Sequence, residues 1–587
     1  SLVLQTLITK LNPDLSLCHF YLDDGFIAGS FSQVKEALTY LNGGDAASKG
    51  VLLNLDKCEM VFRNPEAEGM DMDAEEFAFN CGIGEDKVIM DGNFIVLGSP
   101  IGDPAYCAEV IRTQGQVNQN TIEHINKIDD PQCRYVCLKA CAGICKVNHL
   151  MRTVPPSPEV SAVFIDIHNH MMDAVRLLLP GISEEELIQC QLPVKLGGLG
   201  FRNPSNYHEV AYLSSRCAAA KLDEIDAEND PTLLAIWQTI IQNTDEAVPA
   251  LITNHHHQTE LKMVEDNDTG NKVIDIDAIE WWTWSQHQLS LLIDYGCLHW
   301  LFTRFTVLYE DDAAQEHHAR ARIWCLLAPH CGAFLHARPS RFTGGKMEPA
   351  AWLTAVRIRL GMDVSSREGH QCPICNHRIS KMDKKGRHAL CGCFRGGDKN
   401  RRHNRLCDII AEYVRHAGFQ ARREHRIPGM GDELPADVLA YFCNTTEVCD
   451  IAVTFAGKTL DEIRTMSKLK KPVTYFQDKY ATHYKINKYK QKVERDGIHT
   501  FVPLVANHYG AWSEDAHEWL SKLARMVREK VNQDSHVLDQ KESMALFIRL
   551  SVAIQNEQAR MIAIRRSPED YGFIAQWNAA HHRDEEV

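Results

Sequence analysis

Two adjacent carboxylates lie between apolar runs in the stretch Cys18-His19-Phe20-Tyr21-Leu22-Asp23-Asp24-Gly25-Phe26-Ile27-Ala28-Gly29. Asp24-Gly25 is a tight-turn dipeptide, so the pattern predicts a β-hairpin with Asp23 and Asp24 at its tip. Two such charges about 4 Å apart repel by roughly 4 kcal/mol at an effective dielectric constant of about 20. A divalent cation offsets this repulsion and creates a site for phosphate oxygens. The alternative is a surface hairpin with a polar turn, since acidic pairs also occur at Asp129-Asp130 and Asp311-Asp312.

The segment Phe20–Gly25 resembles the metal-binding hairpin of reverse transcriptases, in the variant found in non-LTR retrotransposons. The following segments keep the order of that family. Ser32–Leu41 has apolar residues at helical spacing. Val51–Glu59 resembles the next strand of the polymerase palm, and Phe94–Gly102 resembles the turn that grips the primer end.

This resemblance implies roles for individual residues. Asp23 and Asp24 would hold the Mg²⁺ (or Mn²⁺) ions of polymerisation, while Lys57 and Gly98 would contact nucleic acid. The family takes a third aspartate from an earlier palm strand, which precedes the part of the palm seen here. The chain begins with Ser1, so we expect a fragment of a longer protein that cannot polymerise alone.

Composition indicates a large globular chain. Its 587 residues suit three or four domains, and the 44% hydrophobic and 24% charged content is ordinary. We find no apolar run long enough to span a bilayer and no signal peptide. The 20 cysteines are scattered, which favours a reducing compartment and metal ligation over a disulfide framework.

The charge is unevenly distributed. The net charge of the chain is −15, yet residues 366–500 contain 26 Lys and Arg against 16 Asp and Glu, a net of +10 that leaves −25 for the remainder. A basic segment of this size predicts a phosphate-binding surface. The alternative is a chance cluster of solvated charges.

The middle of the chain is predicted to be mainly helical. Pro131–Arg152 is a candidate helix, and Ala319–Leu327 and Trp352–Leu360 are predicted helices that lead into the next module. The Gly-rich loop Leu192–Phe201 lacks the spacing of a dinucleotide or phosphate-binding fingerprint.

A zinc-binding pattern follows. Its Cys-x2-Cys-x12-His-x4-Cys spacing comprises Cys372, Cys375, His388 and Cys393. Thiolates and imidazole are zinc ligands, and bound Zn²⁺ would stabilise so small a Gly- and Lys-rich module. Cys391 competes with Cys393 for the fourth position, and His377 is a weaker rival. The alternative is a set of unligated cysteines.

A second acidic pair lies further on. Arg401-Arg402-His403 opens a predicted helix that ends near Gly418. A later hairpin with its turn at Cys443-Asn444 pairs residues whose numbers sum to 887, so Asp437 faces Asp450 across the strands. Cross-strand partners have Cβ atoms about 5 Å apart, and one divalent metal could bridge them. Asp450 lies in an apolar strand, where an uncompensated charge is costly; the alternative is an ordinary hairpin with carboxylates at its edge.

This arrangement resembles restriction-like nucleases of the PD-(D/E)xK type. Zinc module, basic helix, Pro-Ala-Asp and a second Asp together resemble the C-terminal endonuclease of certain non-LTR retrotransposons. The resemblance implies that Asp437 and Asp450 hold Mg²⁺ (or Mn²⁺) and that Glu424 assists. It also implies that the three residues opening the helix, Arg401, Arg402 and His403, contact nucleic acid.

One departure from the nuclease pattern concerns its lysine. Ala452 stands where a lysine normally follows the second acid. In the retrotransposon branch a nearby helix supplies this lysine, and Lys485 and Lys488 are the candidates here. Such a lysine would orient the attacking water or stabilise charge on the phosphate. The alternative is a solvated helix face.

The sequence therefore predicts an α+β, multidomain chain that acts by target-primed reverse transcription. The nuclease would nick target DNA, and the freed 3′-hydroxyl would prime copying of template RNA from deoxynucleoside triphosphates, inside the cell and finally in the nucleus. The alternatives are a standalone metal-dependent DNA nuclease with an inert polymerase remnant, or a non-catalytic nucleic-acid-binding relic. The predicted domains are a partial palm (1–110), a thumb-like helical region (111–225), a helical linker (226–365), a zinc module (366–395), a restriction-like endonuclease (396–510) with a last core strand at Phe501–Val505, and C-terminal helices (511–587).

Overall fold

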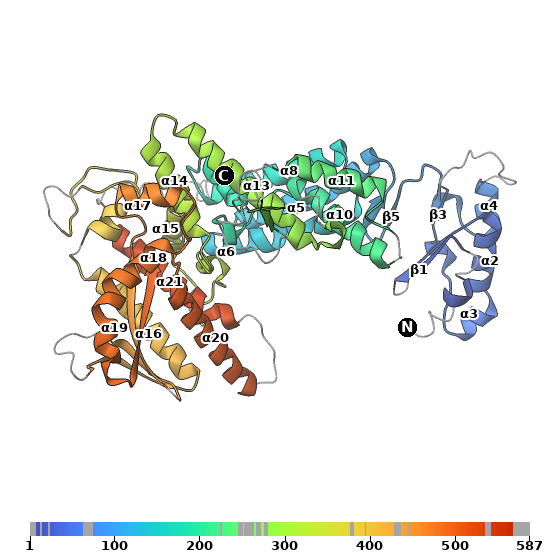
Figure 1. Cartoon of the computed structure of the whole chain (residues 1–587). Coiled ribbons are helices and arrows are strands. Elements are labelled where there is room, and N and C mark those ends of the chain that lie inside the picture. The colour runs from blue at the N-terminus through green and yellow to red at the C-terminus, as the bar shows by residue number, and fades with distance from the viewer. Residues whose placement is uncertain are drawn as a thin grey trace. The chain divides into compact units, whose positions relative to one another are not determined.

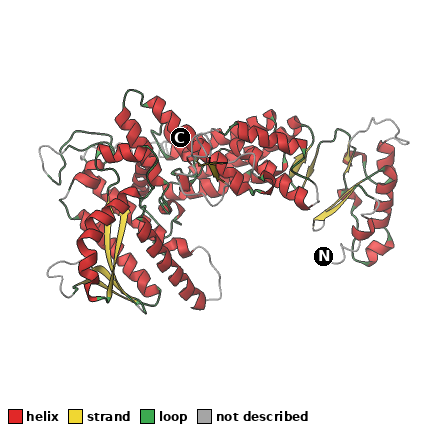
Figure 2. Cartoon of the chain, viewed as in Figure 1, coloured by secondary structure: helices red, strands yellow, loops and turns green. Residues whose placement is uncertain are grey.

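The computed structural model combines many helices with small sheets, as expected for an α+β multidomain chain (Figures 1 and 2). It divides into two compact units, residues 1–113 with 157–160, and residues 114–156 with 161–587. In the described part of the chain, no helix has the length and apolar character needed to cross a membrane. The structure describes residues 8–11, 15–21, 24–62, 74–222, 226–244, 251, 263–265, 272–274, 280–375, 381–393, 395–427, 436–443, 445–534 and 542–566.

The first unit contains the predicted hairpin, formed by β1 (Leu17–Tyr21) and β2 (Asp24–Ala28). Tyr21 pairs with Asp24, so Asp24 and Gly25 belong to strand β2 and the prediction of Asp24-Gly25 as the turn is wrong. Gly25 instead lies opposite Phe20, and a Cβ added to it would come within 2.4 Å of the Phe20 ring. A larger residue at position 25 would therefore clash with the Phe20 ring on the neighbouring strand, which explains the glycine.

The helix predicted after the hairpin is confirmed as α2 (Phe31–Leu41), which begins at a capping box of Ser30 and Gln33. The strand predicted over 51–59 is wrong, because Leu55–Lys57 forms a single 3₁₀ turn in a segment whose Asn and Asp residues favour turns. The other elements of this unit are α3 (Gly44–Ser48), β3 (Met60–Val61), α4 (Ala74–Asn80), β4 (Val88–Ile89), β5 (Phe94–Val96) and β6 (Ser99–Ile101).

The turn predicted within 94–102 is confirmed, because β5 and β6 form an antiparallel hairpin. Its two connecting residues, Leu97 and Gly98, have φ angles of 49° and 79°. Positive φ at both positions is typical of a type I′ hairpin turn, which glycine favours.

The helical part of the second unit surrounds α15 (Pro349–Leu360), whose Trp352, Val356 and Leu360 are fully buried. These side chains share one hydrophobic core with Tyr135 and Leu138. The end of the predicted linker (226–365) is therefore part of the core of this unit. Two helices begin in the first unit and continue here, α5 (Pro104–Asn126) and α8 (Pro158–Leu178). The remaining elements are α6 (Pro131–Cys137), α7 (Asn148–Thr153), α9 (Glu184–Gln191), α10 (Pro204–Leu222), α11 (Pro231–Gln242), β7 (Met263–Glu265), β8 (Lys272–Ile274), α13 (Gln286–Leu308) and α14 (Ala313–Leu326).

The single helix predicted over 131–152 is wrong. After α6 the backbone widens into a π-helical segment at Leu138–Ala142, and Gly143 then adopts an extended conformation with φ −79° and ψ −168°. Apolar spacing continues across this break, which is why the pattern alone predicts one helix. The helices predicted at 319–327 and 352–360 are confirmed within α14 and α15.

The C-terminal part is a four-stranded sheet with strand order β12-β11-β10-β9, in which β9, β10 and β11 are antiparallel and β12 is parallel to β11. The predicted basic helix, last core strand and C-terminal helices are confirmed in α16, β12, α20 and α21. The elements are α16 (Asp398–His416), β9 (Gln420–His425), β10 (Ala436–Tyr441), β11 (Thr446–Thr454), α17 (Leu460–Ser467), α18 (Tyr475–Tyr480), a π-helix at Ala481–Ile486, α19 (Asn487–Val493), β12 (His499–Asn507), α20 (Glu514–Asp534) and α21 (Glu542–Ala563).

Helices cover both faces of this sheet. Val438 and Cys449 belong to a core shared with α16, α20 and α21, whereas Leu439 and Val448 pack with residues of α19 on the opposite face. Because side chains alternate along a strand, Asp450 takes the same side as Val448. Asp437, near the start of β10, reaches His403 of α16 with its carboxylate.

Candidate metal centres

The hairpin of β10 and β11 has the predicted register. Its pairs include Val438 with Cys449 and Tyr441 with Thr446, whose numbers both sum to 887. The ladder ends at the Val438–Cys449 pair, and Asp437 and Asp450 are the next residues along the two strands. Oδ2 of Asp437 accepts a hydrogen bond of 2.7 Å from the backbone N–H of Ile451, which fixes this carboxylate at the end of the ladder.

Lys485 comes to this pair from the π-helix. Its Nζ lies 2.7 Å from Oδ1 of Asp450, and both side chains are largely buried, with 17% and 6% exposed. Burial lowers the pKa of Lys485, but the carboxylate of Asp450 outweighs it and the net pKa is raised. The other candidate, Lys488, is exposed and its Nζ lies 2.7 Å from the hydroxyl of Tyr489.

Asp450 has the properties of a metal ligand. The pKa of Asp450 is raised to about 6, chiefly by burial and also by the neighbouring carboxyl of Asp437, while Lys485 opposes the shift. Its Oδ2 is buried and makes no hydrogen bond within the described part of the chain. A buried carboxylate oxygen without a partner, beside a second carboxylate, suits a divalent cation with oxygen ligands. Asp437 and Asp450 therefore fit Mg²⁺ or Mn²⁺.

His403 approaches the same carboxylates from α16. Its Nε2 lies 3.2 Å from Oδ1 of Asp437, and this contact raises the pKa of the imidazole. Cys407, one helical turn later, places its Sγ 3.5 Å from the same ring nitrogen. Cys407 is not among the residues predicted from the sequence, although the His-x3-Cys spacing places both residues on one helical face.

The other residues expected to bind nucleic acid or metal here make contacts of their own, and Glu424 lies on β9 between the partners of Ala436 and Val438, beside the position of Asp437. Arg401 is half exposed and forms an ion pair with Glu557 at 3.1 Å. Arg402 is buried and donates to the carbonyl of Val453, so its guanidinium is not presented to a ligand. Glu424 is exposed, has a φ of 49° and lies 3.8 Å from Arg423.

A groove of about 680 Å³ runs along the N-terminal half of α16. It combines two arginines with two amides and two acids, which gives it a polar lining. Its residues are Gly397, Asn400, Arg401, Asn404, Arg405, Asp408 and Glu557.

Four side chains form a possible zinc-binding cluster, in which the donor atoms all lie within 4.8 Å of one another: Cys372, Cys375, His388 and Cys393. Sγ of Cys375 lies 3.5 Å from Nε2 of His388. Tetrahedral Zn²⁺ with ordinary bond lengths requires a sulfur–nitrogen separation of about 3.6 Å, so the geometry and the donor set fit the ion. Of the two rival cysteines, Cys393 belongs to the cluster and Cys391 does not; His377 lies outside the described residues.

The cluster is held against the C-terminal helix. Cys372, Cys375 and Cys393 share a small core with Ile562 of α21. Arg565 follows that helix, is 1% exposed and pairs with Asp398 at the start of α16.

The residues expected for polymerisation are spread over the first unit. Asp24 is exposed at the start of β2, whereas Asp23 lies outside the described residues. Lys57 is exposed in its 3₁₀ turn, and Gly98 occupies the β5–β6 turn. In the part of the chain that the structure describes, no hydrogen bond or ion pair joins Asp24, Lys57 and Gly98.

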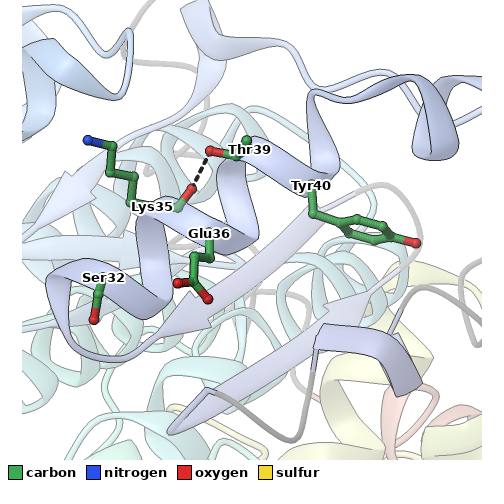
Figure 3. A pocket seen from close by; sticks show the side chains of 5 residues that line it. All are labelled: Ser32, Lys35, Glu36, Thr39 and Tyr40. Carbon is green, nitrogen blue, oxygen red and sulfur yellow. Dashed lines mark hydrogen bonds between the residues drawn. The ribbon is translucent and has the colours of Figure 1, made fainter.

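A pocket of about 450 Å³ lies along the outer face of α2 (Figure 3). Thr39 Oγ1 donates to the carbonyl of Lys35 at 2.7 Å, an ordinary intrahelical bond. Asp24 does not line this pocket, whose described residues are Ser32, Lys35, Glu36, Thr39 and Tyr40.

Neither a scan against protein-family models nor a search of curated proteins returns a match for this sequence. The assignment of the two metal centres therefore depends on their geometry and on the donor atoms described above.

Proposed function

We propose that the chain is part of a non-LTR retrotransposon reverse transcriptase whose C-terminal α/β region is a metal-dependent DNA endonuclease. One observation carries the nuclease proposal. Two carboxylates on paired strands, Asp437 and Asp450, meet a buried lysine 2.7 Å from one of them. This combination of donors and cation suits phosphodiester hydrolysis.

Each of these residues would have a distinct role in the reaction. Asp437 and Asp450 would hold the cation, which when bound supplies Lewis-acid chemistry and an activated water. Lys485 would then face the reacting phosphate and stabilise the charge that develops on it. His403, at 3.2 Å, orients the carboxylate of Asp437.

Two further features support a nucleic-acid substrate. The segment 366–500 has a net charge of +10, and the groove along α16 includes Arg401 and Arg405. Guanidinium groups in a polar groove are suited to phosphate oxygens. In the first unit, the hairpin that carries Asp24 supports the polymerase part of the proposal.

Nicking of supercoiled plasmid in Mg²⁺ or Mn²⁺ tests the nuclease. The full chain is compared with Asp437→Asn, which keeps an acceptor for Ile451 but loses the charge. Asp461→Asn is the matched control, because the Asp461 side chain is 94% exposed on α17. Nicking that is lost in Asp437→Asn and retained in Asp461→Asn supports the proposal; nicking by all three chains, or by none, refutes it.

The ion pair itself favours a second candidate, a non-catalytic nucleic-acid-binding protein. Lys485 satisfies the charge of Asp450 without any metal, as a purely structural pair would. This function would be supported if the full chain binds DNA after divalent metal is chelated, and if neither it nor the two variants nick plasmid.

A further inference from the structure

We infer that His403, Cys407 and Asp437 form a second site for a soft divalent cation of the Zn²⁺ class, distinct from the four-residue zinc cluster. Their donor atoms lie within 4.8 Å of one another. One imidazole, one thiolate and one carboxylate are all ligands that Zn²⁺ accepts, whereas Mg²⁺ does not select sulfur.

Two of the three donor separations are close to those of a tetrahedral site, and the third, between Cys407 and Asp437, is within 4.8 Å. Nε2 of His403 lies 3.2 Å from Oδ1 of Asp437 and 3.5 Å from Sγ of Cys407. Tetrahedral Zn²⁺ requires about 3.4 Å between nitrogen and oxygen and about 3.6 Å between nitrogen and sulfur. The three donors therefore need only small movements to bind one ion.

The elements that present these donors hold them in place. His403 and Cys407 lie one turn apart on α16, a helix of 19 residues, so their side chains share a face. Cys407 is fully buried, and Asp437 is anchored by its bond to Ile451. The side chain of His403 remains 33% exposed, which leaves a path for entry. Three protein ligands would leave the fourth position to water.

Occupation of this site would withdraw Asp437 from Asp450. Binding requires the thiolate of Cys407, so its proton is released to solvent as the metal–sulfur bond forms. Because Asp437 would then coordinate the soft cation, micromolar Zn²⁺ would inhibit Mg²⁺-dependent nicking. This inhibition, unlike the binding, rests on the proposed nuclease function.

Cobalt(II) tests the binding without any need for activity. The full chain is first loaded with one equivalent of Zn²⁺ to fill the four-residue cluster, then titrated with Co²⁺ while thiolate-to-cobalt charge-transfer absorption is recorded. One further Co²⁺ per chain is expected, with an absorption band. Cys407→Ser should abolish the band. His403→Gln should weaken Co²⁺ binding by at least about tenfold, because even the loss of a residue that only contacts a ligand weakens metal binding by about this factor.

Cys443→Ser is the matched control, since Cys443 is an exposed cysteine that lies outside the cluster. A band that persists in Cys407→Ser, or that disappears in Cys443→Ser, overturns the proposal. His403→Gln guards against misfolding of the cysteine variant, because it removes a ligand that is partly exposed. Unchanged Co²⁺ affinity in His403→Gln overturns the proposal as well. Absence of nicking in Mg²⁺ alone would refute the nuclease while leaving the cobalt result intact.

Discussion

Nζ of Lys485 lies 2.7 Å from Oδ1 of Asp450, although 35 positions separate the two residues in the chain. The π-helix at Ala481–Ile486 carries the lysine to the carboxyl-bearing strand, whereas β11 itself has Ala452 two positions after Asp450. This contact distinguishes Lys485 from Lys488, which the sequence could not separate.

Replacement of the lysines should therefore have unequal effects. Lys485→Met is expected to lower the single-turnover rate of plasmid nicking by about 100-fold or more, the usual cost of removing one donor that stabilises transition-state charge. Lys488→Met should keep nearly the wild-type rate, because Lys488 is exposed and lies on Tyr489. Rapid-quench nicking assays at saturating Mg²⁺ measure both.

Loss of a buried partner also affects stability, so a control is needed. Lys485→Met leaves the carboxylate of Asp450 without its cation, which costs about 3–5 kcal/mol in comparable buried pairs. Lys485→Arg keeps the charge and should restore much of the stability but little of the rate, since a planar guanidinium cannot replace the ammonium in this geometry. Equal nicking by Lys485→Met and Lys488→Met would contradict the assigned role.

Binding of Mn²⁺ to the acidic pair should depend steeply on pH. The pKa of Asp450 is raised to about 6 by burial, so below pH 6 a proton occupies this carboxyl and competes with the cation. Asp437 also raises the pKa of His403. As the pH falls, the imidazole therefore becomes a cation beside the site and also opposes Mn²⁺ binding. We expect the affinity to rise with pH through about 6, by more than tenfold per pH unit, and then to level off.

Calorimetric titration with Mn²⁺ between pH 5 and pH 8 measures this dependence, with the zinc cluster loaded throughout. In His403→Gln the slope should decrease to about tenfold per pH unit, since one competing proton remains. An affinity that stays constant across this range would show that Asp450 is not a ligand.

The sequence predicts the local elements of the C-terminal α/β region well. The hairpin register follows from the turn position alone, because each step in an antiparallel ladder fixes the next pair. The Cys-x2-Cys pair and the amphipathic helix α16 are likewise local patterns. What could not be predicted depends on packing between distant segments.

Three residues illustrate this limit. Arg402 looks like a basic surface residue beside Arg401, but it is buried, and its bond to Val453 arises only when α16 packs on the sheet. In the sequence, Cys407 cannot be distinguished from an ordinary core cysteine, because its proximity to Asp437 depends on the packing of α16 against β10. The strand expected around Lys57 fails because polar turn residues outweigh its apolar neighbours.

Zinc content should separate Cys393 from Cys391. Cys393 lies in the four-residue cluster, whereas Cys391 is half-buried and outside it. Cys393→Ser is expected to lose the zinc ion and to unfold at a lower temperature, because the ion stabilises a module with little core. Cys391→Ser should keep the zinc content of the unchanged chain. Metal analysis after gel filtration and thermal unfolding with and without a chelator measure the two effects; loss of zinc from Cys391→Ser alone would reverse the assignment.

The ion pair of Arg565 and Asp398 should couple the C-terminal helix to the start of α16. Both side chains are buried, with 1% and 7% exposed, and their atoms lie 3.2 Å apart. Nη2 of Arg565 also donates to the carbonyl of Arg395 at 2.8 Å. Arg565→Met should lower the free energy of unfolding by about 3–5 kcal/mol, because a buried carboxylate then lacks its cation.

A double-mutant cycle tests this coupling. Asp398→Asn alone leaves the guanidinium of Arg565 without its counter-charge and should also destabilise the chain. The double variant Arg565→Met with Asp398→Asn removes both charges, so its loss in urea unfolding should be smaller than the sum of the single losses by roughly 1–3 kcal/mol. Arg566→Met, at the neighbouring half-buried arginine, controls for general effects at the end of α21. Additive losses would mean that the two charges act independently despite their contact.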